Sequence, residues 1–346
     1  MLALIFESYR NVVSFFGTEP RTLKRYPTDP PIEMSNESDS LSERSTVLVT
    51  GGAGFIGSSI ATELAVEREV TVLDSLVGSD TGRVPTNAEF INGDIRDPET
   101  VDTVAAGTDC LFHQAALVSV DASVDDPMES HAINATGTLN ILKAARTHNS
   151  RVVLASSAAI YGHPETTPIP ESHRTKPTSP YGLDKLACDH YARLYHDLYD
   201  LDTVALRYFN VYGPGQIGGD YAGVISVFLE QALNDDPVTV HGTGEQTRDF
   251  VFVDDVVRAN LLAAETDHVG EAYNVGTGES ISIRELAELI VDITDSDSDI
   301  VHTEARTGDI EHSKADISKA ESKLGYEPTV SIEEGLERTV EWFRTQ

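Results

Sequence analysis

The stretch Thr50-Gly51-Gly52-Ala53-Gly54-Phe55-Ile56-Gly57 decides the fold of this chain. A short β-branched run at 46–50 precedes it, and a stretch with helical periodicity follows it to about residue 67. The glycines therefore lie where a buried strand turns into a helix. A glycine-rich run by itself is often only a turn, but this strand–turn–helix context is typical of dinucleotide-binding loops.

Each glycine of this loop has a predicted role. Gly51 permits the tight turn, and Gly54 lets the backbone approach a pyrophosphate whose charge the helix N-terminus favours. Gly57 allows the helix and the strand to pack closely. Phe55 and Ile56 lie between these glycines and belong to the same predicted cofactor-binding loop.

Asp74 predicts which dinucleotide is bound. It ends a second predicted strand at 69–73 and lies 23 residues after Gly51. A carboxylate at this place can accept hydrogen bonds from both ribose hydroxyls, and its charge would repel a 2′-phosphate. The prediction is NAD rather than NADP, although Asp74 could instead be a turn or capping residue.

The rest of the pattern predicts a parallel sheet. Strands are expected at 88–91, 109–112, 151–155 and 203–206, and helices at 127–148 and 180–199. This alternation is typical of a Rossmann-like, doubly wound α/β fold. We expect an NAD-binding domain at 46–210, to which segments near 250–275 return, and a smaller C-terminal α/β substrate domain at 211–346.

Composition excludes several classes of partner. The chain has 346 residues and a net charge of −32, with 57 acidic and 25 basic residues. Such a surplus of negative charge would repel nucleic acid, and no apolar run is long enough to span a membrane. The acidic, Lys-poor composition favours a halophilic archaeon with a salt-loaded cytoplasm; an acidic mesophilic protein is the alternative.

Two further features bear on location and boundaries. Cys110 and Cys188 are expected to be buried thiols in a reducing, cytoplasmic compartment. Residues 1–45 are expected to form a flexible N-terminal extension without a signal peptide. Met34 is the expected natural start, with a short interaction tail as the alternative.

Ser157, Tyr181 and Lys185 form the candidate catalytic group. Tyr181 and Lys185 lie four residues apart, so they share one face of the predicted helix. An ammonium beside a phenol favours the phenolate and is expected to lower the tyrosine pKa. A serine hydroxyl within reach can hold a substrate oxygen, so the three residues could remove a proton from an alcohol. The spacing alone recurs by chance on many helices.

The ordered motifs of the chain add a resemblance. It resembles the extended short-chain dehydrogenase/reductase family, specifically the NAD-dependent nucleotide-sugar epimerases of the UDP-glucose and UDP-N-acetylglucosamine type. The matching runs are TGGAGFIGS (50–58), GDIRD (93–97), FHQAA (112–116), NATGTLN (134–140), ASSAAIYG (155–162), SPYGLDK (179–185), RYFNVYGPGQ (207–216), TRDFVFVDD (247–255), YNVGTG (273–278) and RTGDI (306–310).

This resemblance implies roles on the cofactor side. Asp94 and Ile95 resemble the pair that holds the adenine, and Ala115 and Ala116 resemble small residues that line the dinucleotide. Asn134 resembles the asparagine that supports the active-site helix, and a purely structural role is equally compatible. The resemblance also implies that Tyr181 is the base and that Lys185 binds the nicotinamide ribose, and it implies no metal.

On the substrate side, the resemblance implies a UDP-sugar. Asn210, Arg248 and Arg306 resemble the residues that bind the diphosphate, and Asp309 resembles the carboxylate that holds the nucleotide ribose. Guanidinium groups suit phosphate oxygens in charge and geometry. Ser313 stands where galactose-type enzymes carry a bulky aromatic residue, which implies room for an N-acetyl group unless the local alignment slips by one residue.

The implied reaction is reversible epimerisation at C4 through a 4-keto sugar. Ala158 and Ala159 follow Ser157 where dehydratases and decarboxylases of this family carry acidic groups. The alternatives are a nucleotide-sugar 4,6-dehydratase or reductase and, more remotely, a non-catalytic NAD-sensing protein. The resemblance also implies a homodimer in which the helices at 127–148 and 180–199 form a four-helix bundle, although their apolar residues could be core instead.

Overall fold

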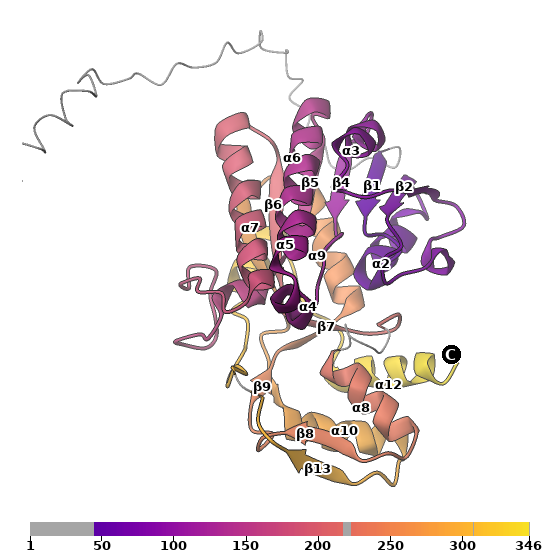
Figure 1. The fold of residues 1–346 in the computed structure, drawn as a ribbon, viewed down its shortest axis with the longest axis vertical. Coiled ribbons are helices and arrows are strands. Elements are labelled where there is room, and N and C mark those ends of the chain that lie inside the picture. The colour runs from indigo at the N-terminus through magenta and orange to yellow at the C-terminus, as the bar shows by residue number, and fades with distance from the viewer. Residues whose placement is uncertain (1–44, 217–222, 307, 346) are drawn as a thin grey trace, which may run out of the picture. The chain divides into compact units, whose positions relative to one another are not determined.

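A seven-stranded parallel sheet forms the centre of the protein (Figure 1). The computed structural model describes residues 45–216, 223–306 and 308–345. Its strand order is β11-β6-β5-β4-β1-β2-β3. The strands are β1 (Thr46–Thr50), β2 (Glu69–Asp74), β3 (Glu89–Asn92), β4 (Cys110–His113), β5 (Arg151–Ser157), β6 (Thr203–Tyr208) and β11 (Glu271–Val275). The Rossmann-like fold predicted from the sequence is confirmed.

The order of the strands reverses between β1 and β4. From β1 the chain builds outward through β2 and β3, and it then returns to place β4 on the other side of β1. In open parallel sheets, ligands bind outside the carboxyl ends of the strands at such a reversal. Thr50 ends β1 at this point and lies beside Leu73 and His113 in the sheet.

Successive residues of β1 face opposite sides of the sheet, and each side is covered by helices. Val47 and Val49 share one core with α2 (Phe55–Leu64) and α9 (Val253–Glu265). Leu48 lies in the other core, with side chains from three helices on the far face. Those helices are α3 (Pro98–Ala105), α6 (Gly137–His148) and α7 (Pro180–Tyr199).

A second, smaller core lies in the C-terminal part of the chain. It is formed mainly by α8 (Val224–Leu233), α10 (Ile283–Thr294), α12 (Ile332–Phe343) and a parallel pair of strands, β8 (Val238–His241) and β13 (Ile300–Thr303). Two further strand pairs join this part to the main sheet region: β7 (Asn210–Tyr212) with β10 (Phe250–Phe252), and β9 (Thr247–Arg248) with β12 (Ile281–Ser282).

Several elements differ from the sequence expectations. The single helix expected at 127–148 is divided into α5 (Pro127–His131), a π-helical turn (Ala132–Thr136) and α6. The helix after the glycine loop, α2, ends at Leu64 rather than near residue 67. The sequence analysis missed α3 although Asp97 caps it and Pro98 begins it. It also missed α4 (Val120–Asp125), and the C-terminal part of the chain forms α11 (Ser318–Leu324) and α12.

Other expectations concern thiols and termini. Cys110 and Cys188 are free and buried, as predicted. Within the described ranges, none of the helices combines the length and apolarity needed to cross a bilayer. The expectations for the N-terminal extension and for Met34 lie outside the described residues.

Candidate active site

The glycine loop after β1 leaves no room for side chains. Gly51 has a φ of +68°, and a Cβ there would lie 2.6 Å from the backbone nitrogen of Ala115. The Gly51 N–H donates to the carbonyl oxygen of Leu73 at 2.8 Å. A Cβ on Gly57 would lie 2.1 Å from the Gly51 carbonyl oxygen. The approach of α2 to this turn therefore requires glycine at both positions.

Gly54 is the N-cap residue of α2 and leaves the N-terminus of this helix open. No side chain caps this helix, although its first N–H groups have no partner within the helix. A Cβ at Gly54 would meet only the Gly51 carbonyl oxygen, at 3.2 Å. Phe55 and Ile56 form the first turn beside this opening. Backbone donors and unfilled space at a helix N-terminus fit a pyrophosphate, so these residues suit a dinucleotide.

Asp74 lies against the same loop. It ends β2, is 9% exposed, and accepts a hydrogen bond from the Ala53 N–H at 3.0 Å. Its other carboxylate oxygen accepts from the Leu76 N–H at 2.8 Å and from the Ser79 hydroxyl at 3.0 Å. These three donors fix the direction of the carboxylate beside the glycine turn.

Asp94 and Ile95 follow β3. The Asp94 carboxylate is bound by the Arg96 guanidinium, with Nε to Oδ1 at 3.0 Å and Nη2 to Oδ2 at 2.6 Å. Hydrogen bonding from Arg96 lowers the pKa of Asp94. Ile95 is buried and meets Gly137 at the start of α6. The Asp94 side chain thus braces its own loop.

Asn134 supports the segment that follows β4. Its side chain accepts the Leu117 N–H at 2.8 Å and donates to the Leu117 carbonyl oxygen at 3.0 Å. Leu117 directly follows Ala115 and Ala116, and the Ala115 N–H donates to the Thr50 hydroxyl at 3.4 Å. Asn134 lies in the π-helical turn, a feature that often marks functional sites.

The end of β5 and the first turns of α7 bring the candidate catalytic residues into one region. Ser157 ends β5, and its hydroxyl accepts the Ala159 N–H at 3.1 Å. Tyr181 is in the first turn of α7, where its N–H donates to the Ser123 hydroxyl of α4 at 3.1 Å. Lys185 is 6% exposed, and its Nζ donates to the Ala155 carbonyl oxygen on β5 at 2.8 Å.

The electrostatics of this group differ from the sequence expectation. Burial raises the pKa of Tyr181, and a hydrogen bond with Ser157 acts in the opposite direction. Burial lowers the pKa of Lys185. The spacing led us to expect a lowered Tyr181 pKa, but in this arrangement burial outweighs the effects that lower it, and the Lys185 amino group is bound to the Ala155 carbonyl oxygen.

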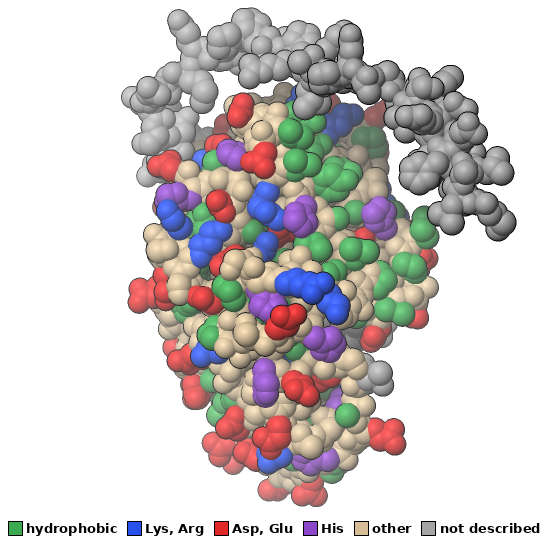
Figure 2. All heavy atoms as spheres, turned by 90° about the vertical axis from the view of Figure 1, so that its left-hand side faces the viewer, with side chains coloured by type: hydrophobic (Ala, Val, Ile, Leu, Met, Phe, Trp, Pro, Cys, Tyr) green, Lys and Arg blue, Asp and Glu red, His purple; other side chains and the backbone are tan. Residues whose placement is uncertain are grey.

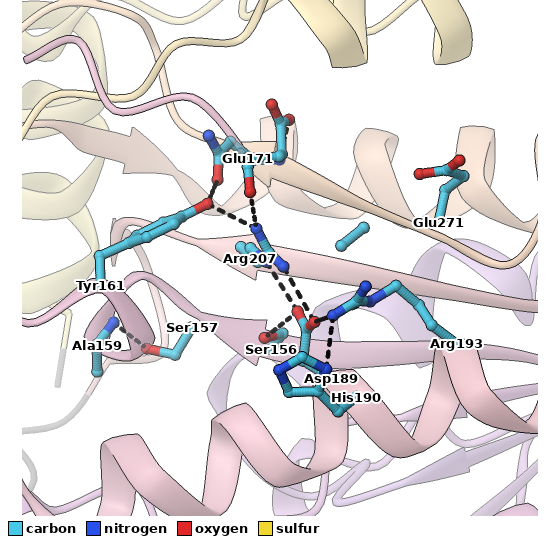
Figure 3. A network of polar contacts seen from close by, with 12 residues as sticks. Ser156, Ser157, Ala159, Tyr161, Glu171, Asp189, His190, Arg193, Arg207 and Glu271 are labelled. Atoms are coloured by element: carbon cyan, nitrogen blue, oxygen red, sulfur yellow. Dashed lines mark hydrogen bonds and ion pairs between the residues drawn. The ribbon is translucent and has the colours of Figure 1, made fainter. Parts of the chain in front are cut away.

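A buried ionic network lies directly behind Ser157 (Figure 3). Asp189 of α7 is fully buried and accepts the Ser156 hydroxyl at 3.1 Å. Arg207 of β6 binds both oxygens of this carboxylate, at 2.8 and 3.0 Å, and Arg193 binds one of them at 2.9 Å. The network therefore ties α7 to the residue that precedes Ser157.

The same network reaches the edge of the sheet. Arg207 also donates to the Tyr161 hydroxyl and to the Glu171 carbonyl oxygen, both at 2.9 Å. The Tyr161 hydroxyl donates to Asn274 of β11 at 2.7 Å. The sequence analysis quoted Tyr161, Arg207 and Asn274 inside motifs but assigned them no role. Their pairing joins distant segments, and no local spacing reveals it.

Arg248 ends β9 and is the first of the predicted substrate-binding residues that we describe. Its side chain is 14% exposed, and its guanidinium donates to the Thr247 carbonyl oxygen at 2.8 Å and forms an ion pair with Asp309. Burial lowers the pKa of Arg248, and Asp309 opposes this shift. Asn210 lies in β7, where its side-chain amide donates to the Asp249 carbonyl oxygen at 2.8 Å. Arg248, Asp309 and Asn210 thus meet around β9 and the residue that follows it.

Arg306 and Ser313 are placed differently. Arg306 is exposed, and its guanidinium has no partner among the residues that the structure describes. Ser313 is 7% exposed, and its N–H donates to the Thr247 carbonyl oxygen at 3.1 Å. Arg306 is therefore not joined to Arg248 directly, whereas Ser313 is fixed beside β9.

Asp249 is a buried residue that the sequence analysis missed. Its carboxylate accepts hydrogen bonds from the Thr277 N–H and hydroxyl, both at 2.8 Å, from the Gly278 N–H at 3.1 Å and from the Ala315 N–H at 3.0 Å. Burial raises the pKa of this carboxyl. Asp249 directly follows Arg248 and thereby ties this segment to the loops that carry Thr277 and Ala315.

A family model described as the NAD dependent epimerase/dehydratase family matches residues 47–276. The chain belongs to this family. The match spans the glycine loop, Asp74, and the Ser157, Tyr181 and Lys185 group, so the predicted NAD dependence and the predicted resemblance are confirmed.

Solved structures and curated relatives that are similar to this chain cover most of its length. One is the UDP-glucose 4-epimerase of Thermotoga maritima with UDP-glucose, which is 39% identical, has a TM-score of 0.84 and covers 87% of this chain and 99% of its own. Another is the UDP-N-acetylglucosamine 4-epimerase of Methanobrevibacter ruminantium in complex with UDP-N-acetylmuramic acid, at 38% identity and a TM-score of 0.84, covering 87% and 98%. The UDP-glucose 4-epimerase of Mycolicibacterium smegmatis is 37% identical over 86% of this chain and 98% of its own length.

The family also includes similar enzymes with other reactions. A dTDP-glucose 4,6-dehydratase of Streptomyces venezuelae with NAD bound is 33% identical, with a TM-score of 0.81 over 87% of this chain and 97% of its own. Family membership alone therefore does not select the reaction.

Proposed function

We propose that this protein interconverts UDP-hexoses at C4, using NAD. The observation that carries the proposal is the placement of Ser157, Tyr181 and Lys185 together, followed by the short helix Ala158–Tyr161. Ala158 and Ala159 at its start cannot donate or accept a proton. The site therefore offers one acid/base residue for one carbon, which suits epimerisation rather than elimination.

Residues of the glycine loop would hold the cofactor. Gly51, Gly54 and Gly57 leave space and backbone donors for the pyrophosphate, and Asp74 is fixed where a ribose would be recognised. Asp94, Ile95, Ala115 and Ala116 would line the remainder. NAD, when bound, supplies the acceptor and donor of hydride for the sugar C4.

The chain's own residues move the proton. Tyr181 as phenolate takes the proton of the 4-hydroxyl, and Ser157 donates a hydrogen bond to that oxygen as it becomes a carbonyl. Because burial raises the Tyr181 pKa, positive charge near the phenol is needed to form the phenolate. Lys185, one helical turn away, is the cation that the chain provides. The C4 epimer would form when the 4-keto sugar presents its other face, so that hydride returns to C4 on that face while Tyr181 gives the proton back to O4.

The substrate's diphosphate would be bound by Arg248, Asn210 and Arg306. Arg248 already forms an ion pair with Asp309, so a bound diphosphate would either displace the Asp309 carboxylate or bind the Arg248 guanidinium beside it. Arg306 has no competing partner among the described residues and can add a second guanidinium. Asp309, once released, is placed to hold the nucleotide ribose. These roles rest on the resemblance and on the charge of the groups.

Ser313 supports acceptance of both UDP-glucose and UDP-N-acetylglucosamine. It is small and fixed beside β9 by its N–H bond to Thr247. The two similar structures from Thermotoga and Methanobrevibacter are named for these two sugars. A large aromatic side chain at 313 would close the space beside the sugar's C2 substituent, so Ser313→Tyr should raise KM for UDP-N-acetylglucosamine more than for UDP-glucose.

A 4,6-dehydratase remains the second candidate, because one of the similar structures has this activity. Incubation with UDP-glucose, UDP-N-acetylglucosamine and dTDP-glucose, with products resolved by NMR, distinguishes the two. We expect the 4-epimer of a UDP-sugar with no loss of water. A 4-keto-6-deoxy product would overturn the proposal.

We also propose a homodimer formed through α5, α6 and α7. Leu183, Tyr191, Leu194 and Leu198 of α7 are 36 to 60% exposed and recur along one stripe of the helix, and Met128 of α5 is 77% exposed. Hydrophobic side chains gather toward the upper right of the face that Figure 2 shows, which includes the side where α7 lies in Figure 1. Exposed apolar stripes on packed helices mark interaction surfaces.

A further inference from the structure

Ser123 carries a fully buried hydroxyl that the proposed mechanism does not use. It lies on α4, where this hydroxyl donates its hydrogen to the Val120 carbonyl oxygen at 2.6 Å. The same oxygen accepts the backbone N–H of Tyr181 at 3.1 Å. Ser123 is therefore in direct contact with the residue to which the proposed function assigns the proton transfer.

The other N–H groups in the first turn of α7 are satisfied from within the same helix end. The Ser179 hydroxyl accepts the Gly182 N–H at 3.1 Å, and the Ser179 carbonyl oxygen accepts the Leu183 N–H at 3.0 Å. Pro180 has no N–H to satisfy. The Tyr181 N–H, by contrast, is bound by a different helix. Ser123 thus fixes the position of this turn at the residue whose phenol is to react.

The short helix α4 is itself anchored to the segment that follows β4. Ser119 caps it by accepting the Ala122 N–H at 3.1 Å. Two residues earlier, Leu117 is bound through both its N–H and its carbonyl oxygen to the Asn134 side chain, at 2.8 and 3.0 Å. Residues 115 and 116, which directly precede Leu117, are those proposed to line the dinucleotide. Figure 1 shows α4 beside the lower ends of α5 and α7, so it connects the cofactor side to the start of α7.

We propose that Ser123 is a positioning residue for Tyr181, which holds the first turn of α7 so that the phenol stays within reach of Ser157 and of the sugar 4-hydroxyl. The inference rests on the proposed function, because that function gives Tyr181 its role. Ser123 itself touches neither substrate nor cofactor in this account. A reacting group that is misplaced by about 1 Å can lose roughly a hundredfold in rate, so one bond to the backbone of this residue affects turnover.

A purely structural role is the competing explanation. In that case Ser123 only packs α4 against α7, and its loss lowers the stability of the protein without changing the turnover of the folded molecules. Ser130 of α5 offers a matched control. It is also a fully buried serine, and its hydroxyl bonds to α7 at 2.7 Å, but at Asp184 instead of Tyr181.

The test compares Ser123→Ala with Ser130→Ala in kcat, KM and bound NAD. Ser123→Ala leaves the Tyr181 N–H without its acceptor, so we expect kcat to fall by roughly tenfold or more while KM stays within about twofold and the NAD content is unchanged. Ser130→Ala should keep kcat within about twofold of the wild type. An unchanged kcat in Ser123→Ala, or equal losses in both variants, would overturn the proposal. If Ser123→Ala does not fold, Ser123→Cys replaces it, because sulfur fills the space but is only a weak acceptor.

A second measurement does not depend on turnover. Burial raises the pKa of Tyr181, and the hydrogen bond with Ser157 lowers it. A phenol that moves away from Ser157 loses this lowering, so Tyr181 should titrate at higher pH in Ser123→Ala than in the wild type or in Ser130→Ala. The ¹³Cζ signal of tyrosine-labelled protein, assigned with Tyr181→Phe among the twelve tyrosines, reports this titration. An unchanged titration would refute the inference. If the wild type proves inactive on every UDP-sugar while the titration shifts, the proposed function fails and the placement of Tyr181 by Ser123 stands.

Discussion

Replacing Arg207 by methionine should destabilise the protein far more than the same change at Arg193. Both guanidinium groups bind the Asp189 carboxylate, but the Arg207 side chain is 5% exposed and that of Arg193 is 31% exposed. Arg207→Met removes two bonds to Asp189 and leaves the Tyr161 hydroxyl and the Glu171 carbonyl oxygen without this donor. The two variants therefore differ mainly in burial and in the number of lost contacts.

The size of the effect follows from the buried charge. Breaking a buried ion pair by removing one partner costs about 3 to 5 kcal/mol in unfolding free energy. Arg193 stays on Asp189 in the Arg207 variant, so we expect about 3 kcal/mol, or a fall of roughly 6 to 10 °C in Tm. Arg193→Met removes a pair that is partly solvent-screened and should cost at most about 1 kcal/mol.

Thermal unfolding by circular dichroism at one fixed salt concentration measures both variants. A Tm for Arg207→Met that falls no further than that of Arg193→Met would refute the reasoning.

The dependence of stability on pH provides a second check on the same ion pair. Burial opposes ionisation of Asp189, but Arg207 and Arg193 outweigh it and lower its pKa. The stabilisation is therefore present above the carboxyl pKa of the unfolded chain and is lost as pH falls through the lowered folded value.

Three further predictions concern the site and the surface. Gly57→Ala should abolish NAD retention, because the added Cβ would lie 2.1 Å from the Gly51 carbonyl oxygen. The cofactor released from the purified protein measures this, and a wild-type NAD content in the variant would contradict the packing. The pH profile of kcat/KM should be bell-shaped and narrow. Burial raises the pKa of Tyr181, which must lose its proton, and burial lowers the pKa of Lys185, which must keep its proton. A flat profile would argue against these roles. Leu198→Asp should convert the proposed dimer to a monomer in light scattering at constant salt, and a dimer that survives this change would contradict an interface through α7.

Short-range patterns in the sequence predicted most of the central fold. β-branched runs predicted several strands, and the glycine run was correctly predicted to form the turn after the first strand, where Gly51 has a positive φ. The helix at 127–148 was predicted without its π-helical turn at Ala132–Thr136. That turn depends on tertiary contacts, including the bonds from Asn134 to Leu117, and local periodicity does not encode them.

The electrostatics of the site were the hardest part to predict. The spacing of Tyr181 and Lys185 is visible in the sequence, but the desolvation that raises the Tyr181 pKa depends on burial in the folded protein. The pairing of Asp189 with Arg207 joins α7 to β6, and the four bonds to Asp249 join three loops. These contacts join residues that lie far apart in the sequence and meet only in the folded protein, so they cannot be predicted from the spacing of a motif.

The stereochemistry at a single carbon tests the central claim most directly. UDP-glucose carrying deuterium at C4 is incubated with the protein in ordinary water, and the product is examined by NMR and mass spectrometry. The account predicts UDP-galactose with the deuterium fully retained at C4, and a rate in Tyr181→Phe lower by roughly two to four orders of magnitude. Loss of the deuterium to solvent, or a Tyr181→Phe rate equal to that of the wild type, would contradict oxidation and return at that carbon by this site.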